Sequence, residues 1–131
     1  MESVKAVFVI LFGLCIGSFL NVAIYRIPRR ESVSEERSHC PKCGHPLAAK
    51  DLVPVLSWVV LRGKCRYCGA PISLRYPLVE LAGAMTAYGA YLLAGPTWKA
   101  VALAVAILAE FVHVMIRLDS RCSRVRAPYA E

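Results

Sequence analysis

The sequence predicts an all-α membrane protein with three transmembrane helices and a small module between the first and the second helix. Hydrophobic residues make up 57% of its 131 residues, whereas soluble domains average about 45–50%, and the mean hydropathy is +0.51. Of the sixteen Lys and Arg residues, ten lie in 26–76, four in 117–131, and one each in 1–25 and 77–116. Such alternation of basic and apolar segments is typical of a multi-span membrane protein and argues against nucleic acid as a partner.

The first transmembrane helix is expected within residues 1–25. Residues 6–24 form a run of nineteen residues without charge, close to the roughly 20 that an α-helix needs to cross the hydrocarbon core of a bilayer. A cleaved signal peptide is the alternative. The run is longer than a usual signal-peptide core, and Ile24-Tyr25-Arg26-Ile27 offers no small-residue cleavage site, so we expect this helix to be retained.

Two further apolar stretches predict an antiparallel pair of transmembrane helices over residues 77–96 and 97–118. Only Gly95-Pro96-Thr97 separates the two apolar runs. Three buried helices of a soluble α protein are the alternative. Because loops rich in Lys and Arg stay in the cytoplasm, the N-terminus is predicted outside, and residues 26–76 and the tail 119–131 inside.

A repeated cysteine motif predicts a zinc-ribbon-like module in the cytoplasmic segment 26–76. Cys40-Pro41-Lys42-Cys43-Gly44 recurs as Cys65-Arg66-Tyr67-Cys68-Gly69. Two residues between thiolates let one tight turn present both sulfurs to the same ion, and two such turns complete a tetrahedral site. Two disulfides are the alternative, which a reducing cytoplasm disfavours. We therefore predict structural zinc on Cys40, Cys43, Cys65 and Cys68.

Other Cys and His residues are not expected to bind this ion. His39 and His45 flank the first motif, and either could replace a sulfur, but four cysteines already complete the shell, so both histidines are interpreted as surface residues. Cys15 and Cys122 have no sequence partner at metal spacing and are interpreted as free thiols.

An apolar stretch, residues 51–63, separates the two cysteine motifs and is too short to cross a bilayer. One interpretation is the hydrophobic filling of a module that is too small to fold without metal. The other is an interfacial helix with Trp58 at the level of the lipid headgroups. Both interpretations can hold together.

Several motifs occur in an order that is specific to one family. They are Gly17-Ser18-Phe19-Leu20-Asn21-Val22, Tyr25-Arg26-Ile27-Pro28, Ser38-His39-Cys40-Pro41-Lys42-Cys43, Pro54-Val55-Leu56-Ser57-Trp58, Leu61-Arg62-Gly63-Lys64-Cys65 and Ile72-Ser73-Leu74-Arg75-Tyr76-Pro77. This set resembles the amino-terminal half of the bacterial type IV prepilin peptidases. The specific motifs cover residues 13–80, and the resemblance extends weakly through the third expected span.

The resemblance implies a multi-pass aspartic endopeptidase of the bacterial inner membrane that removes the leader peptide of type IV prepilins and pseudopilins. Bifunctional members also methylate the new N-terminus from S-adenosylmethionine. Two aspartates at the cytoplasmic ends of membrane helices share this work: one activates a water and the other protonates the leaving amide.

The sequence departs from the family where these aspartates should lie. Alignment of Leu118-Asp119 with the family's first catalytic position keeps an aspartate but places Arg126 at a family proline; alignment of Ile116-Arg117 puts Arg at the catalytic position. We prefer Asp119 as one half of the dyad, against a solvated carboxylate that offsets the four arginines of the tail. The family's second motif, Gly-x-Gly-Asp, does not occur in these residues.

We therefore expect the chain to be inactive alone, as a truncated or degenerate copy or as a subunit completed by a separate carboxy-terminal half. The competing hypothesis is a non-catalytic, membrane-anchored zinc module that binds prepilin or the pilus or secretion assembly machinery.

Five polar residues within the expected spans are assigned roles. Glu110, His113 and Arg117 share one helix face, either as a contact surface for missing spans or substrate or with Arg117 at the interface. Glu80 is expected to stabilise a helix N-terminus. Asn21 is placed to form a hydrogen bond between helices.

Overall fold

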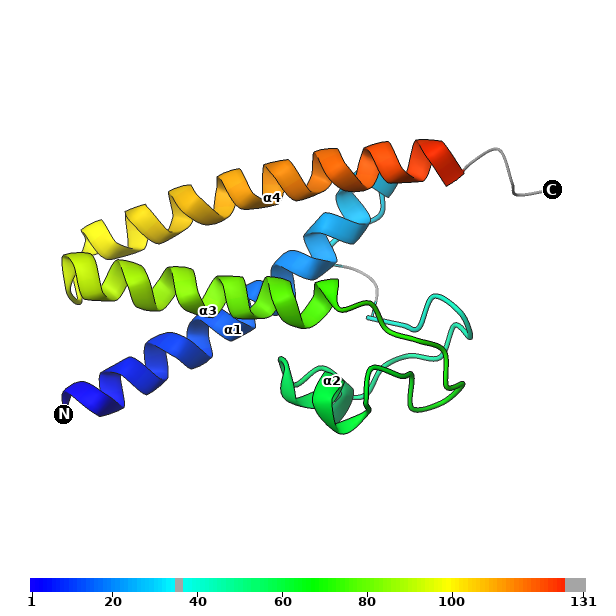
Figure 1. The fold of residues 1–131 in the computed structure, drawn as a ribbon, viewed down its shortest axis with the longest axis horizontal. Coiled ribbons are helices and arrows are strands. Elements are labelled where there is room, and N and C mark those ends of the chain that lie inside the picture. Colours follow the sequence, from blue (N-terminus) through cyan, green and yellow to red (C-terminus); the bar gives the residue numbers. More distant parts are fainter. Residues whose placement is uncertain (35–36, 127–131) are drawn as a thin grey trace.

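The computed structural model describes residues 1–34 and 37–126, with the backbone alone for 120–126 (Figure 1). The regular elements of the described part are helices, and two isolated bridges pair His39 with Pro46 and Lys64 with Pro71. Its elements are α1 (Glu2–Arg26), η1 (Ile27–Arg29), η2 (Ala49–Asp51), α2 (Leu56–Val60), α3 (Arg75–Ala94) and α4 (Trp98–Arg126). The prediction of an all-helical protein is confirmed, and the module between α1 and α3 lies beside one end of the three long helices.

Glycines allow α1 and α3 to cross in backbone contact. A Cβ built on Gly17 would lie 2.6 Å from the Cα of Glu80, and one on Gly83 would lie 2.5 Å from the carbonyl oxygen of Gly13. Any side chain here would force the helices apart, so these positions require glycine. Near this crossing, the Nδ2 of Asn21 donates a hydrogen bond to the Tyr76 carbonyl over 3.0 Å, which confirms the inter-helix bond predicted for Asn21.

The α3–α4 turn is the tight hairpin that the sequence predicts. Gly95 has a φ of +67°, and the hydroxyl of Thr97 donates to the Ala94 carbonyl over 2.9 Å. The buried Ala100 and Leu108 lie on α4. This helix continues to Arg126 and does not end at residue 118, so Asp119 lies on a helix and not in a tail. Residues 127–131 and the side chain of Cys122 lie outside the described part.

Two helices are long and apolar enough to cross a membrane by length and composition, over Glu2–Arg29 and Trp98–Asp119. Large apolar side chains on them are open to the surroundings, as with Phe8 at 69% and Val101 at 64% exposed. Three transmembrane helices are not confirmed, because α3 is not among these candidates. Its Glu80 and its glycines, tyrosines and threonine lower its hydropathy.

Candidate metal centre and the adjoining carboxylates

The four predicted cysteine ligands meet at one point. One sulfur from each of Cys40, Cys43, Cys65 and Cys68 lies within 4.8 Å of the other three, and the sulfurs of Cys40 and Cys68 are 3.8 Å apart. A tetrahedron with Zn–S distances near 2.3 Å has edges of about 3.8 Å. All four are free thiols, and the spacing of their sulfurs fits a single metal ion.

The two cysteine motifs fold into equivalent turns, which we call the first and second knuckle. The Gly44 N–H donates to the Cys40 carbonyl over 2.8 Å, and the Gly69 N–H donates to the Cys65 carbonyl over 2.9 Å. Gly44 and Gly69 have φ values of +69° and +71°, in the left-handed region that glycine adopts without steric cost. Each turn therefore brings its two sulfurs to the same side.

The ionisation of the sulfurs is uneven. Burial raises the pKa of Cys40, but the backbone N–H groups of Cys43 and Lys42 and the neighbouring thiols more than offset it, and the pKa lies at about 7. For Cys68, the Ala70 N–H lowers the pKa, whereas burial and the other three thiols raise it to about 11. A thiol with a pKa near neutrality is partly a thiolate already, the form that binds a metal.

Asp51 connects the two halves of the module, a role that the sequence analysis missed. Its side chain is 2% exposed and accepts hydrogen bonds from the Arg66 Nε at 2.7 Å, the Tyr67 hydroxyl at 2.9 Å and the Ala48 N–H at 3.2 Å. The Arg66 bond is the main cause that lowers the pKa of Asp51. No motif indicated this role; the only signal was a charge at the edge of an apolar stretch.

The aromatic residues of the module are also used in its own packing. His45 of the first knuckle and Tyr67 of the second have ring centroids 3.7 Å apart. The indole N–H of Trp58 donates to the Ile72 carbonyl over 3.1 Å, and the ring lies against Gly63. The polar group of Trp58 is therefore bonded inside the module, which supports the interpretation of this side chain as part of the module's filling. His39 and His45 are exposed, as predicted.

Asp119 is held by two arginines from distant parts of the chain. Its Oδ1 accepts from the Nη1 of Arg75 at 3.0 Å, and its Oδ2 accepts from the Nη1 of Arg29 at 3.1 Å. The guanidinium of Arg29 also lies 4.0 Å from the ring centroid of Tyr25. With 19% of its side chain exposed, Asp119 is not the freely solvated carboxylate considered as an alternative. Sequence reasoning singled out neither arginine, because no local spacing indicates the contact.

A cavity of about 450 Å³ separates the module from the helices, and Asp119 and Glu80 both line it. Glu80 is 8% exposed, and its Oε2 accepts a hydrogen bond from the Val55 N–H over 2.6 Å. The expected role of Glu80 at a helix N-terminus is wrong, because α3 begins at Arg75 and the carboxylate binds the module instead. Polar, charged and aromatic side chains also line the cavity; among these are Asn21, Tyr25, Arg26, Arg29, Arg75 and Tyr76.

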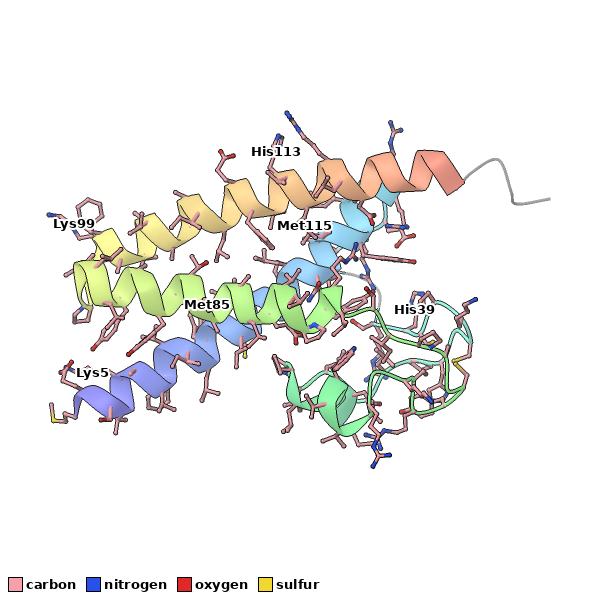
Figure 2. All side chains as sticks on the ribbon, viewed as in Figure 1. Lys5, His39, Met85, Lys99, His113 and Met115 are labelled. Carbon is pink, nitrogen blue, oxygen red and sulfur yellow. The ribbon has the colours of Figure 1, made fainter. Side chains whose placement is uncertain are left out.

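The polar residues expected on α4 do not join this cavity. Glu110, His113 and Arg117 are all exposed, and Figure 2 shows His113 pointing away from the other helices. Lys5 and Lys99 lie at the end of the helices opposite the module (Figure 2). The described structure leaves the polar face of α4 open, which is compatible with either interpretation of it.

Comparisons with known proteins agree with these features. Residues 11–94 match the model of the bacterial peptidase A24 N-terminal domain. A prepilin leader peptidase/N-methyltransferase of Myxococcus xanthus is 59% identical over 76 residues, which cover 58% of this chain and 23% of that protein. Those of Burkholderia pseudomallei and Aeromonas hydrophila are 42% and 41% identical, over 72% and 82% of this chain and 39% and 44% of their own length. No solved structure matches.

The chain thus spans less than half the length of each of these relatives, in their amino-terminal part. The family model covers the region from the glycines of α1 to the end of α3, including both knuckles. This chain belongs to the family of the bacterial peptidase A24 N-terminal domain.

Proposed function

We propose that this chain is the amino-terminal part of a prepilin leader peptidase of the bacterial inner membrane, acting on type IV prepilins or pseudopilins. The observation that carries the proposal is the match of residues 11–94 to the peptidase family together with the four-sulfur cluster inside the matched region. The relatives are named as prepilin leader peptidases, and we propose this activity for the chain by similarity.

We propose three membrane spans, within residues 1–25, 77–96 and 97–118, with the N-terminus outside and both the module 26–76 and the segment 119–131 in the cytoplasm. The hairpin of α3 and α4 supports an antiparallel pair, and the module with its ten basic residues lies beside one end of the long helices. Although α3 is less apolar, it packs between two apolar helices, and a span inside a bundle tolerates such composition.

We propose that the four-sulfur cluster binds one structural Zn²⁺. The ion would hold the two knuckles together and so fix the cavity wall that the module forms. The relatives are also named as N-methyltransferases. If this activity is present, S-adenosylmethionine is the cofactor; no set of residues in the described part is assigned to it.

For catalysis we propose Asp119 as one carboxylate of the dyad. One carboxylate takes a proton from the attacking water while the other gives a proton to the leaving amide, so a second acid is required. We propose that a separate carboxy-terminal half supplies it. The location of Asp119 on the cavity wall supports this role.

A specific observation favours the alternative function. Both carboxyl oxygens of Asp119 already accept hydrogen bonds from arginines, which suits a structural link between helices. In that case the chain is a non-catalytic, membrane-anchored zinc module that binds prepilin or the pilus or secretion assembly machinery.

The test is prepilin cleavage by the purified chain in liposomes, alone and after co-expression with the carboxy-terminal half of a related peptidase. We expect no cleavage by the chain alone and cleavage by the pair, which Asp119→Ala abolishes. Glu110→Ala is the matched control, because Glu110 is an exposed carboxylate on the same helix. Cleavage by the pair that survives Asp119→Ala excludes Asp119 from the dyad. Absence of cleavage, with prepilin bound, supports the binding module.

A further inference from the structure

The segment between the knuckles has an apolar surface that the module does not bury. Residues 52–61 contain no charged side chain. Their exposed members are Leu52 at 42%, Val53 at 41%, Leu56 at 59%, Val59 at 58% and Val60 at 64%. Filling of the module explains Trp58, which is bonded and packed inside, but not these five side chains. We call residues 52–60 the apolar segment.

A hydrogen bond places this segment alongside the helices and not beyond their ends. The Val55 N–H donates to the Oε2 of Glu80 over 2.6 Å, and the Glu80 backbone lies against Gly17 in the α1–α3 crossing. Glu80 lies five residues into α3 and Gly17 nine residues before the end of α1. At 1.5 Å per residue, the Cα of Glu80 lies about 7.5 Å inside the start of α3, so Val55 lies beside the first turns of this helix. Figure 1 shows α2 beside this part of the helices.

Several backbone N–H groups of the segment are bonded within the protein. Val55, with φ +61° and ψ −49°, forms a tight turn in which the Leu56 N–H donates to the Pro54 carbonyl over 2.6 Å. The Ser57 and Val59 N–H groups donate to the carbonyls of Val53 and Val55, both over 3.0 Å. Non-helical backbone at membrane depth is tolerated only when the protein satisfies its polar groups. The turn does not bond the Val55 N–H to a neighbouring carbonyl, and the Glu80 carboxylate accepts this hydrogen bond instead.

Basic side chains stand at both ends of the segment. Lys50 precedes it, Arg62 and Lys64 follow it, and all three are exposed. Long basic side chains reach from an apolar surface to the headgroup level and bind anionic lipids there. The charge pattern therefore complements an anionic leaflet. Leu78 and Leu81 of α3 are also exposed apolar side chains.

We propose that the apolar segment 52–60 is a re-entrant membrane anchor, in which Leu56, Val59 and Val60 contact lipid acyl chains of the cytoplasmic leaflet and Glu80 holds the turn at depth. This inference rests on the membrane topology of the proposed function. The anchor fixes the zinc module against the bilayer, so that the cavity with Asp119 stays at the membrane surface.

The test uses the zinc-loaded chain in vesicles of phosphatidylethanolamine and phosphatidylglycerol that contain a phospholipid with a photoactivatable acyl chain. We expect adducts on Leu56, Val59 and Val60 as well as on α1 and α4, and none on Lys42 or His45 of the first knuckle. Adducts on α1 and α4 without adducts in 52–60 overturn the anchor but leave the membrane topology intact. Absence of adducts on all helices overturns the proposed topology itself.

Two variants test the Glu80 contact. Glu80→Ala removes the acceptor, and we expect loss of adducts from 52–60 with those on α1 unchanged; Glu80→Gln keeps an oxygen acceptor and should keep the adducts. The zinc content of each variant reports whether the module is folded. Unchanged labelling of 52–60 in folded Glu80→Ala shows that Glu80 does not hold the turn. Protection of 52–60 in the wild-type chain by a second polypeptide in place of lipid also overturns the proposal.

Discussion

The Nη1 of Arg75, at the first residue of α3, donates to the Oδ1 of Asp119 near the end of α4 over 3.0 Å. Arg29 of η1 binds the other carboxyl oxygen, so one carboxylate joins the ends of three helices next to the module. The side chains of Arg75 and Arg29 are 23% and 35% exposed. Ion pairs of this exposure contribute little to the stability of a fold.

Arg75→Ala should lower the free energy of unfolding by about 1 kcal/mol or less, because the pair is partly solvated. Chemical denaturation in detergent, followed by circular dichroism, measures this change. Arg117→Ala is the matched control, an exposed arginine on α4, and should have no effect. A loss of several kcal/mol in Arg75→Ala would show that the ion pair is effectively buried.

Metal analysis of the purified chain should find about one zinc per chain, because four sulfurs complete one tetrahedral shell. Cys40→Ser should abolish zinc binding and unfold the module, since its side chain is one of the four ligands. Cys15→Ser is the control: this exposed thiol on α1 lies outside the cluster and should leave the zinc content unchanged. A metal-free chain with two disulfides would refute the site.

Two glycine-to-alanine variants should change stability in opposite directions. Gly17→Ala places a methyl group 2.6 Å from the Glu80 Cα and should destabilise by about 1–3 kcal/mol, because two helix backbones must separate. Gly89→Ala meets no atom within 4 Å and should stabilise α3 by up to about 1 kcal/mol, through reduced freedom of the unfolded chain. Thermal unfolding in detergent measures the stability of both variants. An equal change in stability in the two would contradict the close crossing of α1 and α3.

The stability of the module should depend on pH through Asp51. Its pKa is lowered in the fold, chiefly by Arg66, below the value of about 3.9 for an unfolded chain. The carboxylate therefore contributes stability above this value, and the contribution is lost as the pH falls through the lower, folded pKa.

Asp51→Asn should cost about 1–3 kcal/mol at neutral pH, because the neutral amide removes the charge beside Arg66 and keeps one acceptor oxygen for the donors that two oxygens now bind. The difference from the wild-type chain should shrink as the pH falls below about 4. Zinc is also released in acid, but both chains have the same thiols, so their difference isolates Asp51. If the difference in stability between the two chains did not change with pH, the altered shape of the side chain and not its lost charge would be the cause.

Periodic and closely spaced features were predictable from the sequence. The Cys-x-x-Cys-Gly motifs predicted a four-sulfur cluster, and the structure brings those sulfurs within 4.8 Å of one another. The Gly95-Pro96-Thr97 turn predicted the hairpin of α3 and α4. Such features depend on neighbours in the chain, whose geometry a few residues determine.

The exact ends of helices were less predictable. The segment after residue 118 reads as a polar tail, yet α4 continues to Arg126. Asp119 and the arginines that follow it are compatible with either a helix or a tail, because charged side chains are solvated in both. Contact of Asp119 with Arg29 and Arg75 favours the helical position.

By itself, the sequence determined the apolar helices, the metal-ligand cluster and the family, because each depends on composition or on spacing within about thirty residues. Only the tertiary structure decided which side chains meet across the helices: Glu80 with Val55, and Asp119 with Arg29 and Arg75. These partners are set by the register in which Gly13, Gly17 and Gly83 let α1 and α3 cross. A crossing register depends on the close packing of two whole surfaces; the Gly13-x-x-x-Gly17 spacing marks a packing face of α1 but not the residues of α3 that it meets.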